Sequence, residues 1–127
     1  MHFRPELAAI LAAAVLAGGS TAVPAQQVRM LIQSSPVAGF RYHDAPALFH
    51  RLKVGDRLDL VREPTNPHDP AAVGVDWRGH RLGYVPRREN SALAWAMDGG
   101  EAVTARISAL REHRNPRQRI RFEVFVE

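Results

Sequence analysis

The stretch LVREPTNPHDPAAVGV, from Leu60 to Val75, decides the fold that the sequence predicts. Its first residues are the end of a strand expected over residues 57–62. Prolines then occupy positions 64, 67 and 70, where they fix φ and remove backbone donors, so a rigid polar loop replaces the strand. After the loop, apolar and small or polar residues alternate, which predicts a second strand over residues 72–77. The stretch therefore predicts two strands joined by a proline-locked loop.

Short strands continue on both sides of this unit. Residues 78–80 predict a tight hairpin turn, and residues 81–85 then return antiparallel. Further strands are predicted over 28–32, which residues 34–36 end, and over 37–42, 103–110 and 120–126. A helical turn is predicted at about 45–52. One main helix is predicted at about 87–97, and it begins after Pro86 and ends at Gly99 and Gly100. About six strands and one main helix predict a mainly β fold with minor α, a small bent sheet or barrel.

Length and composition narrow the class of protein. A chain of 127 residues has room for one domain and too little for separate substrate and cofactor domains. The absence of cysteine excludes disulfides, thiolate zinc sites and a cysteine nucleophile. The net charge of +4 favours a polyanionic partner, because cations at phosphates release counterions. An arginine-rich genome would produce the same charge, so this signal is weak alone.

Residues 1–25 are typical of a secretory signal peptide. Arg4 supplies a positive start, the run Leu7–Ala17 is apolar, and small residues end the segment at Ala25. The apolar run is too short to span a bilayer, so we expect no membrane span in the mature form. The sequence thus predicts export, periplasmic or secreted, after cleavage near Ala25. The alternative is a true start at Met30, which would leave the same domain in the cytoplasm.

Three stretches together resemble the HIRAN domain family, including its standalone bacterial members. They are VAGFRY at residues 37–42, LVREP leading into NPHD and AVGV within 60–75, and GYVP at 83–86. The resemblance covers roughly residues 30–127 and implies an OB-like barrel that binds single-stranded DNA at a free 3′-OH end. Larger members carry an ATPase motor, but this chain has no Gly-x-x-x-x-Gly-Lys-Ser/Thr loop. We therefore expect a non-catalytic module without a cofactor.

A pocket for a DNA end needs aromatic faces, cations and an acceptor for the terminal hydroxyl. Asp69 is the candidate acceptor, because an ionised carboxylate only accepts hydrogen bonds and would repel a 3′-phosphate. Its alternative role is to close the turn that begins at Asn66. Tyr42 matches the family's base-stacking position, with Arg41 beside it for a phosphate or base edge. The alternative for Tyr42 is a residue at the rim of the barrel.

Four more residues complete the predicted site. His43 stands where relatives often carry a second aromatic ring, and His68 stands where tyrosine is common; an imidazole stacks less area but can become cationic. Tyr84 and Arg87 lie at a strand-to-helix junction, where Arg87 and Arg88 could hold a phosphate at the helix start. The alternative for this junction is a solvated helix end without a ligand. The predicted nucleic-acid-binding set is Arg41, Tyr42, His43, His68, Asp69, Tyr84 and Arg87, without catalytic residues or metal ligands.

Other readings of the sequence stay open at this point. His43, Asp44, His68 and Asp69 could serve a metal-dependent nuclease, although no pair has helical metal-ligand spacing. An exported, envelope-associated interaction protein could use the same barrel for a peptide, glycan or polyanion. A serine hydrolase has no support, since Gly-x-Ser-x-Gly does not occur. The tryptophans, Trp77 and Trp95, are assigned to packing in the core or at its rim.

Overall fold

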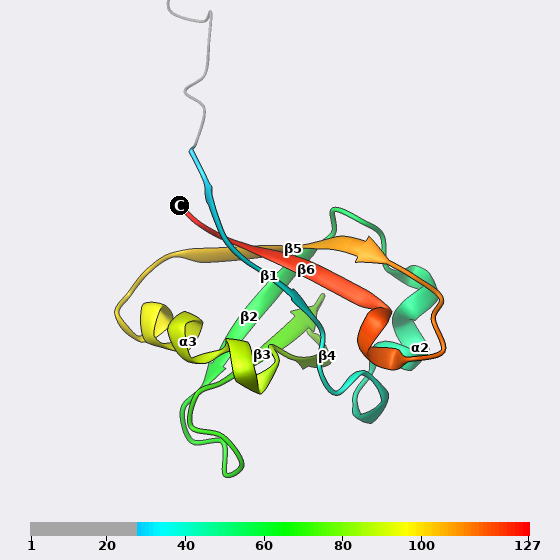
Figure 1. Cartoon of the computed structure of the whole chain (residues 1–127), viewed down its shortest axis with the longest axis horizontal. Helices are drawn as coiled ribbons and strands as arrows, with labels where there is room; N and C mark the ends of the chain where they lie inside the picture. The colour runs from blue at the N-terminus through cyan, green and yellow to red at the C-terminus, as the bar shows by residue number, and fades with distance from the viewer. Residues whose placement is uncertain (1–27) are drawn as a thin grey trace, which may run out of the picture.

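The structure is a computed structural model that describes residues 28–127. The predicted signal peptide, residues 1–25, lies outside the described residues. The described chain forms one antiparallel sheet in the order β1-β6-β5-β2-β3-β4. The strands are β1 (Met30–Pro36), β2 (Arg57–Glu63), β3 (Ala72–Trp77), β4 (His80–Tyr84), β5 (Val103–Leu110) and β6 (Ile120–Val126). In Figure 1, β5 and β6 cross over β2 and β3, so the sheet is strongly bent. The predicted mainly β, OB-like fold is confirmed.

The two edges of the sheet meet at a single point. Ala38, just beyond β1, pairs with Tyr84 at the end of β4 through two backbone hydrogen bonds of 2.8 Å each. Gly83 makes this approach possible, because a Cβ at that position would lie 2.2 Å from the carbonyl oxygen of Ala38. No continuous ladder joins β1 to β4 in the described sheet. The expected barrel is thus an open, bent sheet that is pinned by one bridge.

The first strand differs from the prediction. It runs over Met30–Pro36 instead of 28–32, and the residues expected to end it pair with β6. Ser35 lies opposite Phe122 and is fully buried, and its hydroxyl is satisfied there because it donates to Glu89 at 2.7 Å. The prediction of a strand over 37–42 was wrong for the residues after Ala38. Gly39 adopts a left-handed φ of 77°, which turns the chain into a 3₁₀ turn at Phe40–Tyr42.

The helices are short and are broken more often than predicted. The turn expected at 45–52 consists of α2 (Ala45–Leu48) followed by a 3₁₀ turn at Phe49–Arg51. The main helix expected at 87–97 is split into a 3₁₀ turn, Arg87–Glu89, and α3, Ser91–Asp98. Asn90 separates the two and is buried, with its side chain directed to Asp69. Within the described residues, no helix has the length and apolar character to cross a membrane.

The core lies in the fold of the bent sheet. Its largest buried side chains come from several strands and from α3, among them Leu58, Trp77, Leu82, Leu93, Ile107 and Phe122. Trp77 is a core residue as predicted, and its indole N–H donates to Asp56 at 3.0 Å. Trp95 is not, since it is 82% exposed on α3. The helical pattern alone did not show which face of α3 meets the sheet.

Candidate functional site

A hollow of about 390 Å³ opens where the loop after β2 approaches the Ala38–Tyr84 bridge. We call it the Asp69 hollow. Five of the seven predicted site residues line it: His43, His68, Asp69, Tyr84 and Arg87. They come from four separate segments of the chain: the turn after Gly39, the proline-locked loop, the end of β4 and the 3₁₀ turn that follows β4. The fold therefore assembles most of the predicted site in one place.

Asp69 offers an ionised acceptor to this hollow. Its Oδ1 accepts the backbone N–H of Ala71 at 2.9 Å, and its Oδ2 accepts the side-chain amide of Asn90 at 2.7 Å. These two donors, the Ala71 N–H first, hold the pKa of the Asp69 carboxyl below its usual 3.8 despite the cost of burial. Each carboxylate oxygen can accept a further hydrogen bond. Asp69 can thus receive a hydroxyl without giving up its existing partners.

The turn from Asn66 to Asp69 is closed by the side chain of Asn66, while the side chain of Asp69 holds the next turn at Ala71. The side-chain oxygen of Asn66 accepts the backbone N–H groups of His68 at 2.8 Å and Asp69 at 3.3 Å. This is the side-chain-to-backbone turn that asparagine favours. The alternative role considered for the Asp69 side chain is therefore filled by its neighbour, and Asp69 is free to face the hollow while it holds Ala71.

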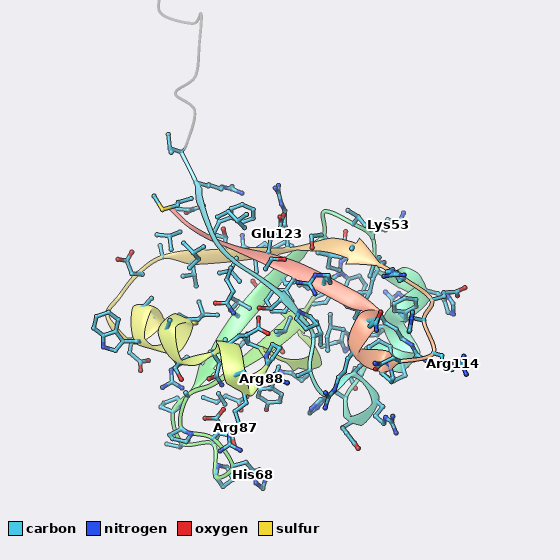
Figure 2. The ribbon with its side chains drawn as sticks, viewed as in Figure 1. Lys53, His68, Arg87, Arg88, Arg114 and Glu123 are labelled. Atoms are coloured by element: carbon cyan, nitrogen blue, oxygen red, sulfur yellow. The ribbon has the colours of Figure 1, made fainter. Side chains whose placement is uncertain are left out.

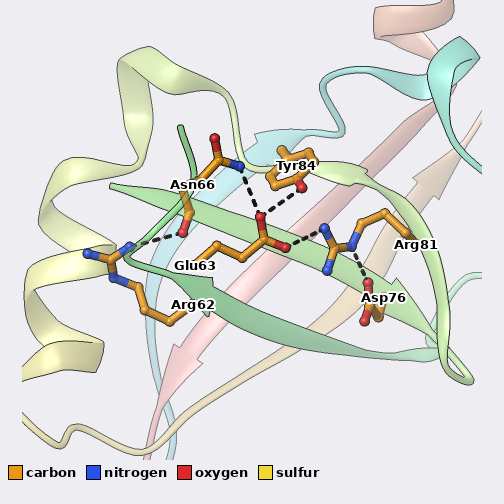
Figure 3. Close-up of polar contacts among 7 residues, drawn as sticks. Arg62, Glu63, Asn66, Asp76, Arg81 and Tyr84 are labelled. Atoms are coloured by element: carbon orange, nitrogen blue, oxygen red, sulfur yellow. Dashed lines mark hydrogen bonds and ion pairs between the residues drawn. The ribbon is translucent and has the colours of Figure 1, made fainter. Parts of the chain in front are cut away.

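Glu63 ties the loop to the sheet beneath the hollow (Figure 3). Its Oε1 accepts the Tyr84 hydroxyl at 2.8 Å and the Asn66 amide at 3.0 Å, while its Oε2 accepts the Arg81 guanidinium at 2.7 Å. Arg81 is held in turn by Asp76. Burial raises the pKa of Glu63, but the hydrogen bonds from Asn66, Arg81 and Tyr84 outweigh it and keep the pKa below its usual value.

Tyr84 therefore contributes its ring and not its hydroxyl to the hollow. Burial and the bond to Glu63 raise the pKa of its phenol. The ring lies 5.4 Å from the His43 ring, centroid to centroid, and the Arg81 guanidinium is 4.8 Å from the Tyr84 ring centroid. His43 and Tyr84 thus form an aromatic wall in the hollow that Asp69 also lines, as a base-stacking site requires.

Arg41 and Tyr42 lie outside the Asp69 hollow. They border a second hollow of about 220 Å³, the Tyr42 hollow, with the loop residues Asn115, Pro116 and Arg117. Tyr42 is 78% exposed, so its ring is available to a ligand. The two parts of the predicted site are adjacent, because Gly39 lines both hollows.

A third hollow of about 730 Å³ joins the other two along Gly39, Arg87 and Arg117. We refer to the three together as the basic groove, whose walls carry Arg41, Arg87, Arg88 and Arg117. Arg87, labelled in Figure 2 near His68, lines the Asp69 hollow together with that residue. Within residues 28–127, only Arg87 of these four reaches an acidic side chain, with its Nε 4.0 Å from Asp69.

The phosphate seat predicted at the helix start needs a correction. Arg87 and Arg88 lie on a 3₁₀ turn of three residues, whereas α3 begins only at Ser91. In the turn, the Glu89 N–H is bonded to the Pro86 carbonyl at 2.8 Å. Arginine side chains, and not the N-terminus of a long helix, are what this junction can offer to a phosphate.

Three contributors to the site were missed from the sequence: Asn66, Asn90 and Arg117. Asn66 had a signal, because an Asn-Pro pair in a turn often bonds its own backbone. Asn90 had none, since it fitted the pattern of the predicted helix. Arg117 lies on the loop between β5 and β6, more than seventy residues from Arg41 in the chain, and only the fold brings them together.

The alternative of a metal-dependent nuclease would need a cluster of metal-ligating side chains. Among residues 28–127, no group of three or more His, Cys, Asp or Glu side chains is arranged to hold a metal ion. Asp44, one of the ligands considered, lies against His80 with 3.6 Å between Oδ2 and Nδ1.

The chain is similar to known proteins over the whole described domain. A family model described as the HIRAN domain matches residues 31–127. The crystal structure of a protein from Lactobacillus plantarum is similar with a TM-score of 0.68 and 28% identity, over 78% of this chain and 95% of that one. The crystal structure of the HIRAN domain of human HLTF is similar with a TM-score of 0.60 and 21% identity, over 77% and 78% of the two chains. No curated protein matches the chain.

Proposed function

The chain belongs to the HIRAN domain family, and on this premise we propose that it captures single-stranded DNA at a free 3′-OH end without catalysis. Membership in the family supports a nucleic-acid-binding module. One observation carries the finer proposal: an ionised carboxylate, an aromatic wall and an arginine line one hollow, which is part of the basic groove.

Each part of the Asp69 hollow has a role in this proposal. The terminal 3′-hydroxyl donates to Asp69, and the last base stacks against the wall of His43 and Tyr84. A 3′-phosphate, or a strand that continued, would bring negative charge against the Asp69 carboxylate and be rejected. The phosphates behind the end lie along Arg87 and Arg88, which supply affinity that does not depend on sequence.

Binding of two strands that differ only at the 3′ end tests the proposal. We expect the full chain to bind a strand of about eight nucleotides with a 3′-OH on the order of tenfold more tightly than the same strand with a 3′-phosphate. Asp69→Asn keeps the shape of the side chain but removes its charge, so the preference should largely disappear. Asp59→Asn removes the same charge from an exposed position on β2 and should leave the preference intact.

Two results would contradict the proposal. Equal affinity of the unmodified protein for both strands would exclude recognition of the end. Magnesium-dependent cleavage of the strand during the titration would exclude a non-catalytic module and favour the nuclease alternative. Thermal unfolding of both variants shows whether each keeps its fold.

A further inference from the structure

A fourth hollow, of about 380 Å³, is not used by the proposed function. It lies between the turns that carry Phe49 and the loop that joins β5 to β6, and we call it the hairpin pocket. The lining residues that matter here are Phe40, Phe49, His50, Glu112, Arg114 and Arg119. Phe40 lines both this pocket and the Tyr42 hollow, so the pocket is adjacent to the basic groove.

The floor of the hairpin pocket is aromatic and fixed. Phe40 is buried and meets Phe49 edge to face, with 5.9 Å between ring centroids and 72° between planes. Phe49 in turn meets His50, with centroids 5.8 Å apart at 77°. Because Phe49 also packs against the core, its position does not depend on a ligand. A rigid aromatic surface beside a groove is what a flat, unstacked base requires.

The rim of the hairpin pocket is mainly cationic. The Arg119 guanidinium lies 5.0 Å from the Phe40 ring centroid, and its Nε donates to the His113 carbonyl at 2.6 Å. Its terminal nitrogens and the whole guanidinium of Arg114 make no ion pair within the described residues. Glu112 is the one acid in the lining, and it lies 3.9 Å from His50. Figure 2 shows Arg114 at the outer edge of the molecule, away from Arg87.

We propose that the hairpin pocket is a second nucleotide subsite, which holds a base and phosphate of the same strand upstream of its 3′ end. This inference rests on the proposed function, which places the 3′ end in the Asp69 hollow and so sets the direction of the strand. A strand whose end lies in the Asp69 hollow passes Gly39 into the Tyr42 hollow, and then passes Phe40 into the hairpin pocket. The base would lie against Phe49, and Arg114 and Arg119 would contact the phosphates.

Length dependence of binding tests the subsite. We would titrate the full chain with unlabelled oligothymidylates that end in a 3′-OH, from about two to about ten nucleotides long. Affinity should rise on the order of tenfold between the shortest strands and those that reach the hairpin pocket. Arg114→Ala removes a phosphate contact and Phe49→Leu removes the aromatic face, so each should reduce this gain. Arg57→Ala, an exposed cation at the start of β2, should keep it.

The outcomes separate this inference from the proposed function. If affinity increases with strand length as much in Arg114→Ala as in Arg57→Ala, the subsite does not exist, whether or not a 3′-OH is preferred. If the gain depends on Arg114 but the 3′-OH preference is absent, the subsite holds and the end-capture proposal fails. Should Phe49→Leu not fold, the exposed Arg114 still decides the result, and Arg114→Lys should restore part of the gain because it keeps the charge.

Discussion

Asn90 and Asp69 show how a side chain outside the predicted set controls one inside it. Asn90 is 2% exposed, and its amide donates to the Asp69 carboxylate at 2.7 Å. A buried hydrogen bond to a charged group is among the stronger polar interactions in a protein. Asn90 therefore both orients the proposed acceptor and favours its ionised form, although it lies twenty-one residues away in the chain.

Replacement of Asn90 should measure this interaction. Asn90→Ala is expected to lower the free energy of unfolding by about 2 kcal/mol, because the partly buried carboxylate of Asp69 loses a donor. Asn90→Asp keeps the volume but places a second carboxylate against Asp69, so it should cost more at neutral pH. Urea unfolding at pH 7 measures both. Equal stability of the two variants would mean that packing, and not the hydrogen bond, explains the burial of Asn90.

The residues of the site that could be predicted share one property. His68, Asp69 and Tyr84 lie in or beside the two stretches whose turn chemistry is visible in the sequence. Asn90 and Arg117 could not be predicted, because their roles arise from contacts between segments that no local pattern connects. The predicted set is divided between two hollows for the same reason. The division depends on the turn at Gly39, whose left-handed backbone could not be predicted from the sequence.

Among the elements, β4 carries the tightest constraint. A Cβ at Gly83 would lie 2.2 Å from the Ala38 carbonyl oxygen and 2.6 Å from a methyl group of Val37. Gly83→Ala should therefore break the bridge between the sheet edges and lower the free energy of unfolding by about 3 kcal/mol. Gly99→Ala is the matched control, since its Cβ would meet atoms only at 3.5 Å. Urea unfolding with equal losses in the two variants would contradict the close approach.

Glu63 links the elements that form the site, and it should make their stability depend on pH. Its pKa in the folded protein is lowered from 4.5, so its contribution to stability is present above pH 4.5 and is lost as the pH falls through the folded pKa. Glu63→Gln should lower the free energy of unfolding by about 1 to 2 kcal/mol at pH 7. It should also flatten the decline below pH 4.5, which thermal unfolding across this range would show. A decline as steep as in the unmodified protein would mean that other carboxylates dominate.

Strands with a buried face were the elements that the sequence predicted best. The bounds of β3, β5 and β6 agree with the alternation of apolar residues, because in each case one face meets the core. The strand β1 lies at the edge, and Met30, Leu31 and Ile32 are exposed, so no such alternation marked its extent. The split of the main helix was hidden for a related reason, since Asn90 is compatible with a helix and only its contact with Asp69 explains the break.

For the whole molecule, the distribution of charge matters more than the net charge of +4. Several acidic side chains of the described residues are engaged by arginines that do not line the groove: Asp98 by Arg62, Asp76 and Glu63 by Arg81, Glu123 by Arg106, and Glu127 by Arg29. In the same residues, Arg41, Arg88 and Arg117 have no acidic partner. The lining of the basic groove thus carries an excess of positive charge, with four arginines against Asp69 and Glu89. The composition could indicate a polyanionic partner but not this location.

Salt dependence of binding should reveal how many groove arginines meet phosphates. Each phosphate contact to a single strand contributes about −0.7 to the slope of log K against log salt, so for a strand too short to reach the hairpin pocket the four groove arginines predict a slope of about −3. Arg117→Ala should reduce the magnitude of the slope by about 0.7, because it removes one contact in the groove. Arg57→Ala removes the same charge from β2 and should leave the slope unchanged. Anisotropy titrations at several salt concentrations measure both, and an equal change in the two variants would show that overall charge, and not the groove, attracts the strand.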